Sequence, residues 1–190
     1  AGVYANGYKV TFGDTNYHGD AVGAAGRWVD IQGKVAPGTI LVTADDNTGL
    51  MSNNKEARLK YGYAFASTGN GSIVDGDGFA TKIIKDGEAM LVLATTNFFS
   101  GGVEVKNGGL FLATVGAAGT GAISVHTDNK WTLDVWDDTT TSGAWSTDES
   151  VTGRTGAEIM VCYRHSDDTA SGFRAPTVTN DIVMVDNDST

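Results

Sequence analysis

The residues with the clearest potential for chemistry are clusters of Asp and Asn close to glycine. Across Asp14–Gly19, oxygen ligands stand at positions one and three and a glycine at position six, as at the start of an EF-hand loop. The carboxylate needed at position twelve is replaced by Ala25. Similar clusters occur at Asp45–Asn47, Asp75–Gly78 and Asp186–Asp188. Because Asp and Asn favour turns on their own account, we prefer turns and assign no metal ligand, leaving a loop-bound Ca²⁺ as the alternative.

Residue types needed for catalysis are present without a supporting pattern. The three histidines, His18, His126 and His165, lie far apart, and no G-x-S-x-G sequence occurs. Cys162 is the only cysteine and lies in an alternating apolar stretch, where a thiol usually serves as a small buried hydrophobe. The Gly116–Gly121 stretch has the wrong order for a phosphate-binding loop. We therefore predict no catalytic residue, no cofactor and no enzyme activity.

Tryptophan offers one alternative, carbohydrate binding. Trp28, Trp131, Trp136 and Trp145, with Asp134, Asp137 and Asp138 close by, are residue types that form a stacking platform with a hydrogen-bonding rim. Trp131 and Trp136 are five positions apart, so they point to opposite faces of a strand. An adhesin-like β-sandwich module with exposed tryptophans is therefore the second functional hypothesis, although burial against a neighbour is the commoner fate of tryptophan.

The elements that must position these residues are short strands. Apolar and polar residues alternate with a period of two over many short stretches, which is the pattern of a half-buried strand. Strands are expected at Tyr8–Phe12, Trp28–Ile31, Thr39–Thr43, Leu59–Phe65, Phe79–Ile84, Met90–Thr95, Val103–Val105, Gly109–Val115, Ala122–His126, Trp131–Val135, Ile159–Tyr163 and Ile182–Val185.

Turn signals between these strands indicate how they pair. Asp86-Gly87 and Asn107-Gly108 each separate two apolar stretches, as in a two-residue hairpin. One short helix is expected at Asn54–Leu59, capped by Ser52 or Asn53, and none is long enough for a parallel α/β crossover. The predicted fold is all-β: an antiparallel sandwich, jelly roll or barrel with long loops. We expect one domain over 1–190, with a subdivision near 120–130 as the alternative.

Composition restricts the partners. The chain has 190 residues, 41% of them hydrophobic and 19% charged, with a net charge of -10. This charge repels phosphate backbones and anionic membrane surfaces, so we predict neither nucleic-acid nor membrane binding. No stretch approaches the roughly 18 apolar residues of a membrane span. Ala1 fits removal of an initiator methionine or of a leader.

Long segments without strand pattern are the expected contact regions. These are Thr15–Gly26, Asp137–Thr155 and Ser166–Asn180, rich in Gly, Thr, Ser and Asp. Long irregular loops are usually functional or disordered, so we expect subunit contacts there and at the chain ends. The predicted interface residues are Val3, Tyr4, Tyr17, Trp136, Trp145 and Phe173.

The short Gly/Thr/Asp-rich strands, such as Lys106–Thr114 and Ala117–His126, resemble a known class of protein. With one cysteine, few prolines and no active-site motif, the chain is similar to β-rich virion proteins of tailed bacteriophages, such as capsid decoration (cement) proteins. The resemblance implies a structural role in the virion, assembled in the host cytoplasm. It also implies a homo-oligomer, often a trimer, bound to the major capsid protein. The carbohydrate-binding alternative implies an extracellular location instead.

Overall fold

The computed structural model describes residues 5–16, 18–46, 49–51, 59–126, 158–161 and 178–185. This part of the chain consists of short strands and one four-residue 3₁₀ helix, η1 (Ala24–Arg27). The prediction of an almost entirely β protein is therefore confirmed for these residues.

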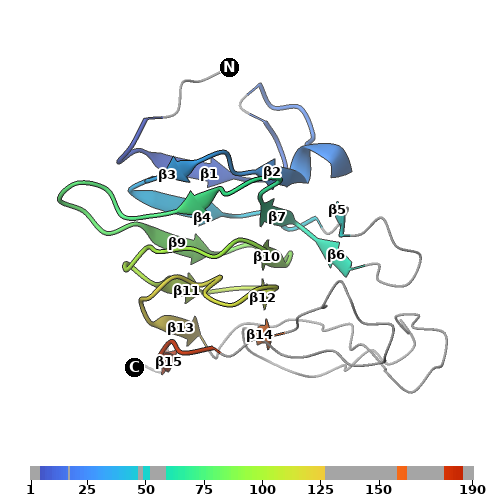
Figure 1. Ribbon diagram of the computed structural model, residues 1–190. Coiled ribbons are helices and arrows are strands. Elements are labelled where there is room, and N and C mark those ends of the chain that lie inside the picture. The colour runs from blue at the N-terminus through green and yellow to red at the C-terminus, as the bar shows by residue number, and fades with distance from the viewer. Residues whose placement is uncertain are drawn as a thin grey trace, which may run out of the picture.

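Most strands belong to two sheets, stacked side by side in Figure 1. The first sheet has six strands, β1 (Lys9–Phe12), β4 (Thr39–Val42), β9 (Lys82–Lys85), β11 (Val103–Val105), β13 (Ile123–His126) and β15 (Ile182–Val185). The second sheet has five, β2 (Trp28–Asp30), β7 (Tyr63–Ala66), β10 (Leu91–Leu93), β12 (Gly109–Leu112) and β14 (Glu158–Val161). Every neighbouring pair within these two sheets is parallel.

The chain visits the two sheets in turn. Apart from β3, β5, β6 and β8, strands of the first and second sheets alternate along the chain, and successive strands of either sheet stack in chain order. β3 (Lys34–Val35) and β8 (Ser72–Ile73) form a short third sheet beside these two, and this pair is also parallel. This winding is that of a parallel β-helix, whose axis runs from β1 to β15 in Figure 1. β5 (Gly49–Met51) and β6 (Leu59–Tyr61) form an antiparallel pair between β4 and β7.

The predicted antiparallel sandwich, jelly roll or barrel is wrong. The prediction assumed that parallel neighbours need a crossover helix. In this chain the crossover is a strand of the opposite sheet, since the connection from β9 to β11 passes through β10. Residues 86–102, which include β10, therefore form the connection that a helix forms in α/β proteins.

The two turn signals interpreted as hairpins are corners of the β-helix. Asp86-Gly87 connects β9 of the first sheet to β10 of the second, and Asn107-Gly108 connects β11 to β12 in the same way. A tight Gly-containing turn followed by an apolar stretch looks the same along the sequence in both cases. The strands that it joins pair with other turns of the helix, not with each other.

The strand positions agree with the sequence analysis better than their pairing does. A strand overlaps every predicted range except Trp131–Val135, which is outside the described residues. The predicted strand Leu59–Phe65 is divided at Gly62 into β6 and β7. A Cβ atom on Gly62 would lie 2.6 Å from the Cβ of Ala89, so glycine allows the chain to pass close to the next turn. Most of the predicted helix, residues 54–58, is outside the described part, and Leu59 begins β6.

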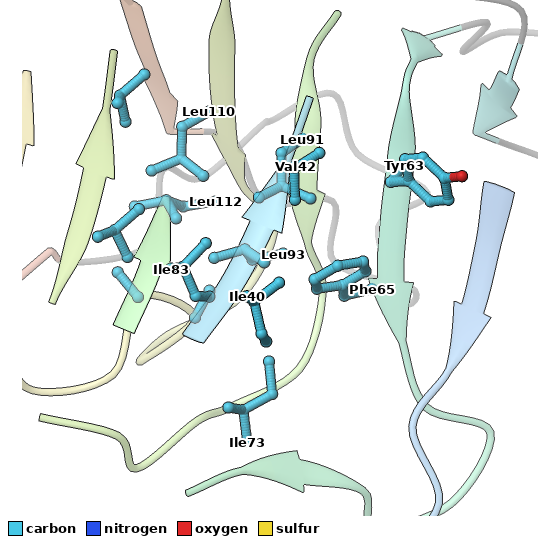
Figure 2. Packing of buried hydrophobic residues seen from close by; sticks show 14 of the residues in the cluster. Ile40, Val42, Tyr63, Phe65, Ile73, Ile83, Leu91, Leu93, Leu110 and Leu112 are labelled. Atoms are coloured by element: carbon cyan, nitrogen blue, oxygen red, sulfur yellow. The ribbon is translucent and has the colours of Figure 1, made fainter. Parts of the chain in front are cut away.

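The core lies between the two sheets, where inward side chains form straight rows. One row of the first sheet consists of Val10, Ile40, Ile83, Val103, Ile123 and Ile182. Figure 2 shows Ile40 and Ile83 packing towards aromatic and leucine side chains of the second sheet, which are Tyr63, Phe65, Leu91, Leu93, Leu110 and Leu112. Such continuous burial contributes about 1.5–3 kcal/mol per large side chain and holds successive turns together.

The second sheet is apolar on its outer face as well. Ala64, Val92 and Phe111 align across three strands and are buried, with Met90 and Tyr61 beside them. Strands covered on both faces carry continuous apolar stretches instead of alternation, as in Leu91–Leu93.

Candidate functional site

The six predicted interface residues lie outside the described part of the chain. They are Val3, Tyr4, Tyr17, Trp136, Trp145 and Phe173. Cys162, His165 and the Asp186–Asp188 cluster also lie outside it. These predictions stay open, and the candidate site has to be built from other residues.

The last strand of the first sheet, β15, is apolar and exposed. Ile182, Val183 and Met184 of β15 are 54%, 45% and 62% exposed. Ile182 and Met184 continue the rows that point into the core in every preceding strand. Their exposure means that the hydrophobic core reaches the surface at the β15 end of the helix.

The second feature of β15 is its place at the end of the sheet order of the described strands. β15 pairs with β13, and within the described residues no strand lies on its other side. Sheet edges are usually protected from further pairing by lysine, proline or a bulge. β15 has the sequence Ile-Val-Met-Val and carries none of these residues. Within the described residues, Ile182, Val183 and Met184 therefore combine a place on an edge strand with exposed apolar side chains, which is what a docking strand requires.

The sequence analysis located this strand at Ile182–Val185 but did not list it as an interface. The available signal was the composition: four consecutive apolar residues with no polar alternation. Such a stretch reads equally well as a central strand covered on both faces. Only its terminal place in the sheet order shows that it is an edge.

No protein-family model, curated protein or solved structure matches this chain.

The aspartates considered as cation ligands are instead connectors between turns of the helix. The Asp14 carboxylate accepts backbone N–H groups from Asp45 at 3.0 Å and Asp46 at 3.2 Å. The Asp45 carboxylate accepts the N–H of Glu88 at 2.8 Å. In the described residues no group of three or more His, Cys, Asp or Glu side chains could hold a metal ion. The turn interpretation agrees with these contacts.

Asp75 and Asp30 have the same role at other corners. Asp75 accepts the N–H of Thr81 and both the N–H and hydroxyl of Ser100, at 2.6–2.9 Å. Asp30 accepts the N–H and hydroxyl of Thr68 at 2.9 and 2.8 Å. Each carboxylate thus ties its corner to a segment at least six residues away in the chain.

Arg27 is a buried charge that serves the fold. Its Nη2 lies 2.9 Å from the Asp14 carboxylate, and Nη1 donates to the carbonyl of Gly62. The guanidinium carbon lies 5.4 Å from the ring centroid of Tyr63, a cation–π geometry. Since its side chain is buried and its donors reach carboxylate and carbonyl oxygens, Arg27 holds the Asp14 loop onto the sheets.

A charged cluster lies on the outward face of the first sheet. Glu104 contacts Lys82 at 2.7 Å, the His126 ring at 3.1 Å and Lys106 at 3.9 Å. The hydrogen bond from Lys82 is the main cause of a lowered Glu104 pKa, with further contributions from His126 and Lys106. These contacts link three neighbouring strands across the sheet, β9, β11 and β13. These contacts are therefore cross-strand pairs of charged side chains.

Of the four tryptophans in the carbohydrate hypothesis, only Trp28 lies in the described residues. It is exposed at the start of β2, at the opposite end of the helix from β15. Within the described residues, no helix is long and apolar enough to cross a membrane.

Acid is expected to destabilise the protein through these carboxylates. Hydrogen bonds lower the Asp30 pKa, chiefly that from the N–H of Thr68. For Asp14 and Asp75, burial raises the pKa, but hydrogen bonds outweigh it and the net pKa is lowered. A lowered folded-state pKa gives stability that is present above about pH 4 and lost as the pH falls through the folded value. Urea unfolding at a series of pH values below neutrality measures this loss.

Asp75→Asn is the variant that tests the acid prediction. It removes an ionised acceptor of three hydrogen bonds, so we expect a loss of about 1 kcal/mol at neutral pH and a weaker acid dependence. Asp77→Asn, two residues along the same exposed turn, is the matched control and should keep the wild-type acid profile. Identical profiles for the two variants would contradict the connector role of Asp75.

Proposed function

We propose that the protein is a non-enzymatic structural subunit that works by binding other subunits through the β15 end of its β-helix. The observation that carries the proposal is the exposure of Ile182, Val183 and Met184 on an edge strand. An apolar edge strand is a template for pairing with another chain. The strand supplies backbone hydrogen bonds, and its side chains supply apolar area.

Covering this strand with another chain contributes free energy that favours association. Complete burial of a large aliphatic side chain contributes about 1.5–3 kcal/mol, and these three side chains are each about half exposed. Covering them therefore yields about half of that value per residue, before the backbone hydrogen bonds are counted. The charge of -10 opposes unspecific clustering of the same subunits.

The described part of the chain is also built as a continuous stack of turns. Successive turns are joined by parallel strand pairing, by continuous apolar rows and by corner carboxylates. Its ionisable side chains are engaged in these contacts at Asp14, Arg27, Asp75 and Glu104, which leaves them to stabilise the stack. These features support a scaffold more than a reaction centre.

We propose a virus particle as the assembly in which the subunit works, as a capsid decoration protein or another virion component. The support is the resemblance of the short Gly/Thr/Asp-rich strands to phage virion proteins. The major capsid protein is then the second partner, beside further copies of this chain. Mass spectrometry of purified particles, searching for peptides of this chain, tests the location.

Val183→Lys is expected to weaken association at least about ten-fold, because a lysine on an edge strand opposes further pairing. The matched control is Val115→Lys, since Val115 is also an exposed valine, at 59%, but lies in the turn after β12. Sedimentation velocity over a wide concentration range compares the wild type with both variants. A wild type that stays monomeric throughout, or equal weakening by the two substitutions, would contradict the proposal.

A further inference from the structure

We infer that the partner of β15 is β1 of a second copy of this chain, so that copies join head to tail. The inference rests on the proposed function and adds the identity and orientation of the partner. β1 and β15 are the two ends of the same six-stranded parallel sheet. A second copy moved along the helix axis therefore presents its β1 to β15 in the parallel orientation that all other strands of this sheet already use.

The register of the sheet brings matching residues together. The inward row that begins at Val10 ends at Ile182, and the row that begins at Phe12 ends at Met184. Between these two inward rows runs the outward row from Thr11 to Val183. In a head-to-tail pair, the exposed core residues of β15 would be followed by Val10 and Phe12 of the next copy. The core would thus continue from one subunit into the next.

The backbone hydrogen bonds follow the same order. The N–H of Ile83 donates to the carbonyl of Gly102, at 3.1 Å, and Val103 and Ile123 repeat this contact with Ala122 and Asp181. In each case the acceptor directly precedes the aligned apolar residue of the next strand. The next donor in this series is Ile182, and its acceptor would be the carbonyl of Lys9, which directly precedes Val10. β1 of the next copy thus offers its carbonyl groups at the positions where the hydrogen-bond pattern of the sheet requires them.

Charge favours this orientation over a tail-to-tail pair. Asp181 directly precedes Ile182 and Lys9 directly precedes Val10, so the two side chains come to the same level of the joined sheet. Both residues are exposed. A pair of two β15 strands would bring no basic residue to Asp181, since β15 contains none.

The two ends also match in polarity. The β1 end of the first sheet exposes Tyr8, and β2, at the same end of the second sheet, exposes Trp28. The β15 end exposes three aliphatic residues. Aromatic side chains at one end and aliphatic ones at the other form the apolar centre that stable interfaces contain. A head-to-tail contact uses different surfaces on the two partners and does not close on itself, so it generates linear chains of subunits.

Disulfide trapping distinguishes the orientations. In a Cys162→Ser background, Thr11→Cys and Val183→Cys are combined in the full chain and oxidised under mild conditions. Neighbouring strands lie about 4.8 Å apart, a spacing at which disulfides form. The head-to-tail pair predicts a ladder of covalent multimers on a non-reducing gel. Val183→Cys alone should stay monomeric on the same gel.

Each other outcome overturns the inference in a distinguishable way. A covalent dimer from Val183→Cys alone would show a tail-to-tail pair. Oligomers in solution without any disulfide between positions 11 and 183 would leave the proposed function standing and reject the β1–β15 contact. A wild type that is monomeric at every concentration would reject both.

A charge exchange provides a second, independent readout. Lys9→Asp and Asp181→Lys are each expected to weaken association several-fold by placing like charges at the same level. The double variant restores the pair with its signs exchanged and is expected to recover most of the wild-type association. Failure of the double variant to recover, while each single variant remains folded by circular dichroism, would overturn the register.

Discussion

Replacing Gly108 with alanine is expected to reduce the free energy of unfolding by at least about 4 kcal/mol, a large fraction of the stability of a typical domain. Gly108 lies at the corner between β11 and β12 with φ of 68°. A Cβ atom there would lie 2.7 Å from the carbonyl oxygen of Glu88, 2.8 Å from that of Ala89, and closer still to that of Gly87. All three oxygens belong to the backbone of the corner in the preceding turn. The clash cannot be relieved by rotating a side chain.

Gly33→Ala separates this packing effect from the backbone conformation. Gly33 has nearly the same φ, 66°, but no atom lies within 4 Å of the position that its Cβ would take. Alanine at Gly33 should therefore show only the cost of a left-handed residue, about 1–2 kcal/mol. Urea unfolding of both variants measures the difference. Equal losses at the two positions would mean that the corners are not tightly stacked.

Strand positions could be predicted because the pattern that reveals them is local. Tyr8–Phe12 and Ala122–His126 alternate apolar and polar residues, and β1 and β13 lie within these ranges. The pairing of a strand depends on segments that lie beyond the next turn of the chain. At Asp86-Gly87 the local chemistry is that of a hairpin, but the strands on either side pair with strands of other turns. The antiparallel prediction failed at this step.

The repeat of the β-helix is hidden by insertions. Ile83, Val103 and Ile123 occupy equivalent positions at twenty-residue spacing. The turn before Ile83 is lengthened by the β5–β6 pair, and Ile182 follows Ile123 only after a much longer segment. With two regular intervals, no period stands out from the sequence. A better signal was the fully apolar stretch Leu91–Leu93, because a half-buried antiparallel strand would alternate.

The candidate site could be predicted even less well. The search concentrated on aromatic residues in long loops, and those residues lie outside the described part of the chain. The strand that the structure exposes, β15, has a composition typical of a core strand. Its exposure results from its last place in the sheet order, which depends on contacts between distant residues. The corner aspartates were interpreted as turn residues, but the backbone N–H groups that they accept from neighbouring turns are likewise tertiary contacts.

Alkaline pH is expected to stabilise the protein, by about 2 kcal/mol between about pH 7 and pH 9.5, through a single lysine. Lys85 occupies an inward row of the first sheet, where the aligned residues are Phe12, Val42, Val105, Val125 and Met184. It is completely buried. Burial lowers the pKa of its amine to about 8, against the opposing influence of Asp45 and Asp86.

The sign of the pH effect on stability follows from how many protons the folded and unfolded chains bind. An unfolded lysine has a pKa of about 10.4, so between pH 8 and pH 10 the unfolded chain binds more protons than the folded one. Stability therefore increases with pH over this interval. Burial raises the pKa of the Tyr61 and Tyr63 hydroxyls, which reverses the trend above about pH 10, because the unfolded tyrosines lose their protons first.

Lys85→Met should abolish the alkaline increase, because methionine fills the same row without an ionisable group. Lys34→Met, at an exposed position of β3, is the control and should retain the increase. Urea unfolding at one protein concentration compares the three proteins across this pH interval. The buried amine donates to the carbonyls of Gly87 and Asn107, which belong to two successive corners, and a neutral amine can still make both contacts. Lys85 thus joins neighbouring turns as the corner aspartates do, and a wild-type profile that stays flat up to pH 9.5 would show that its ammonium group reaches water.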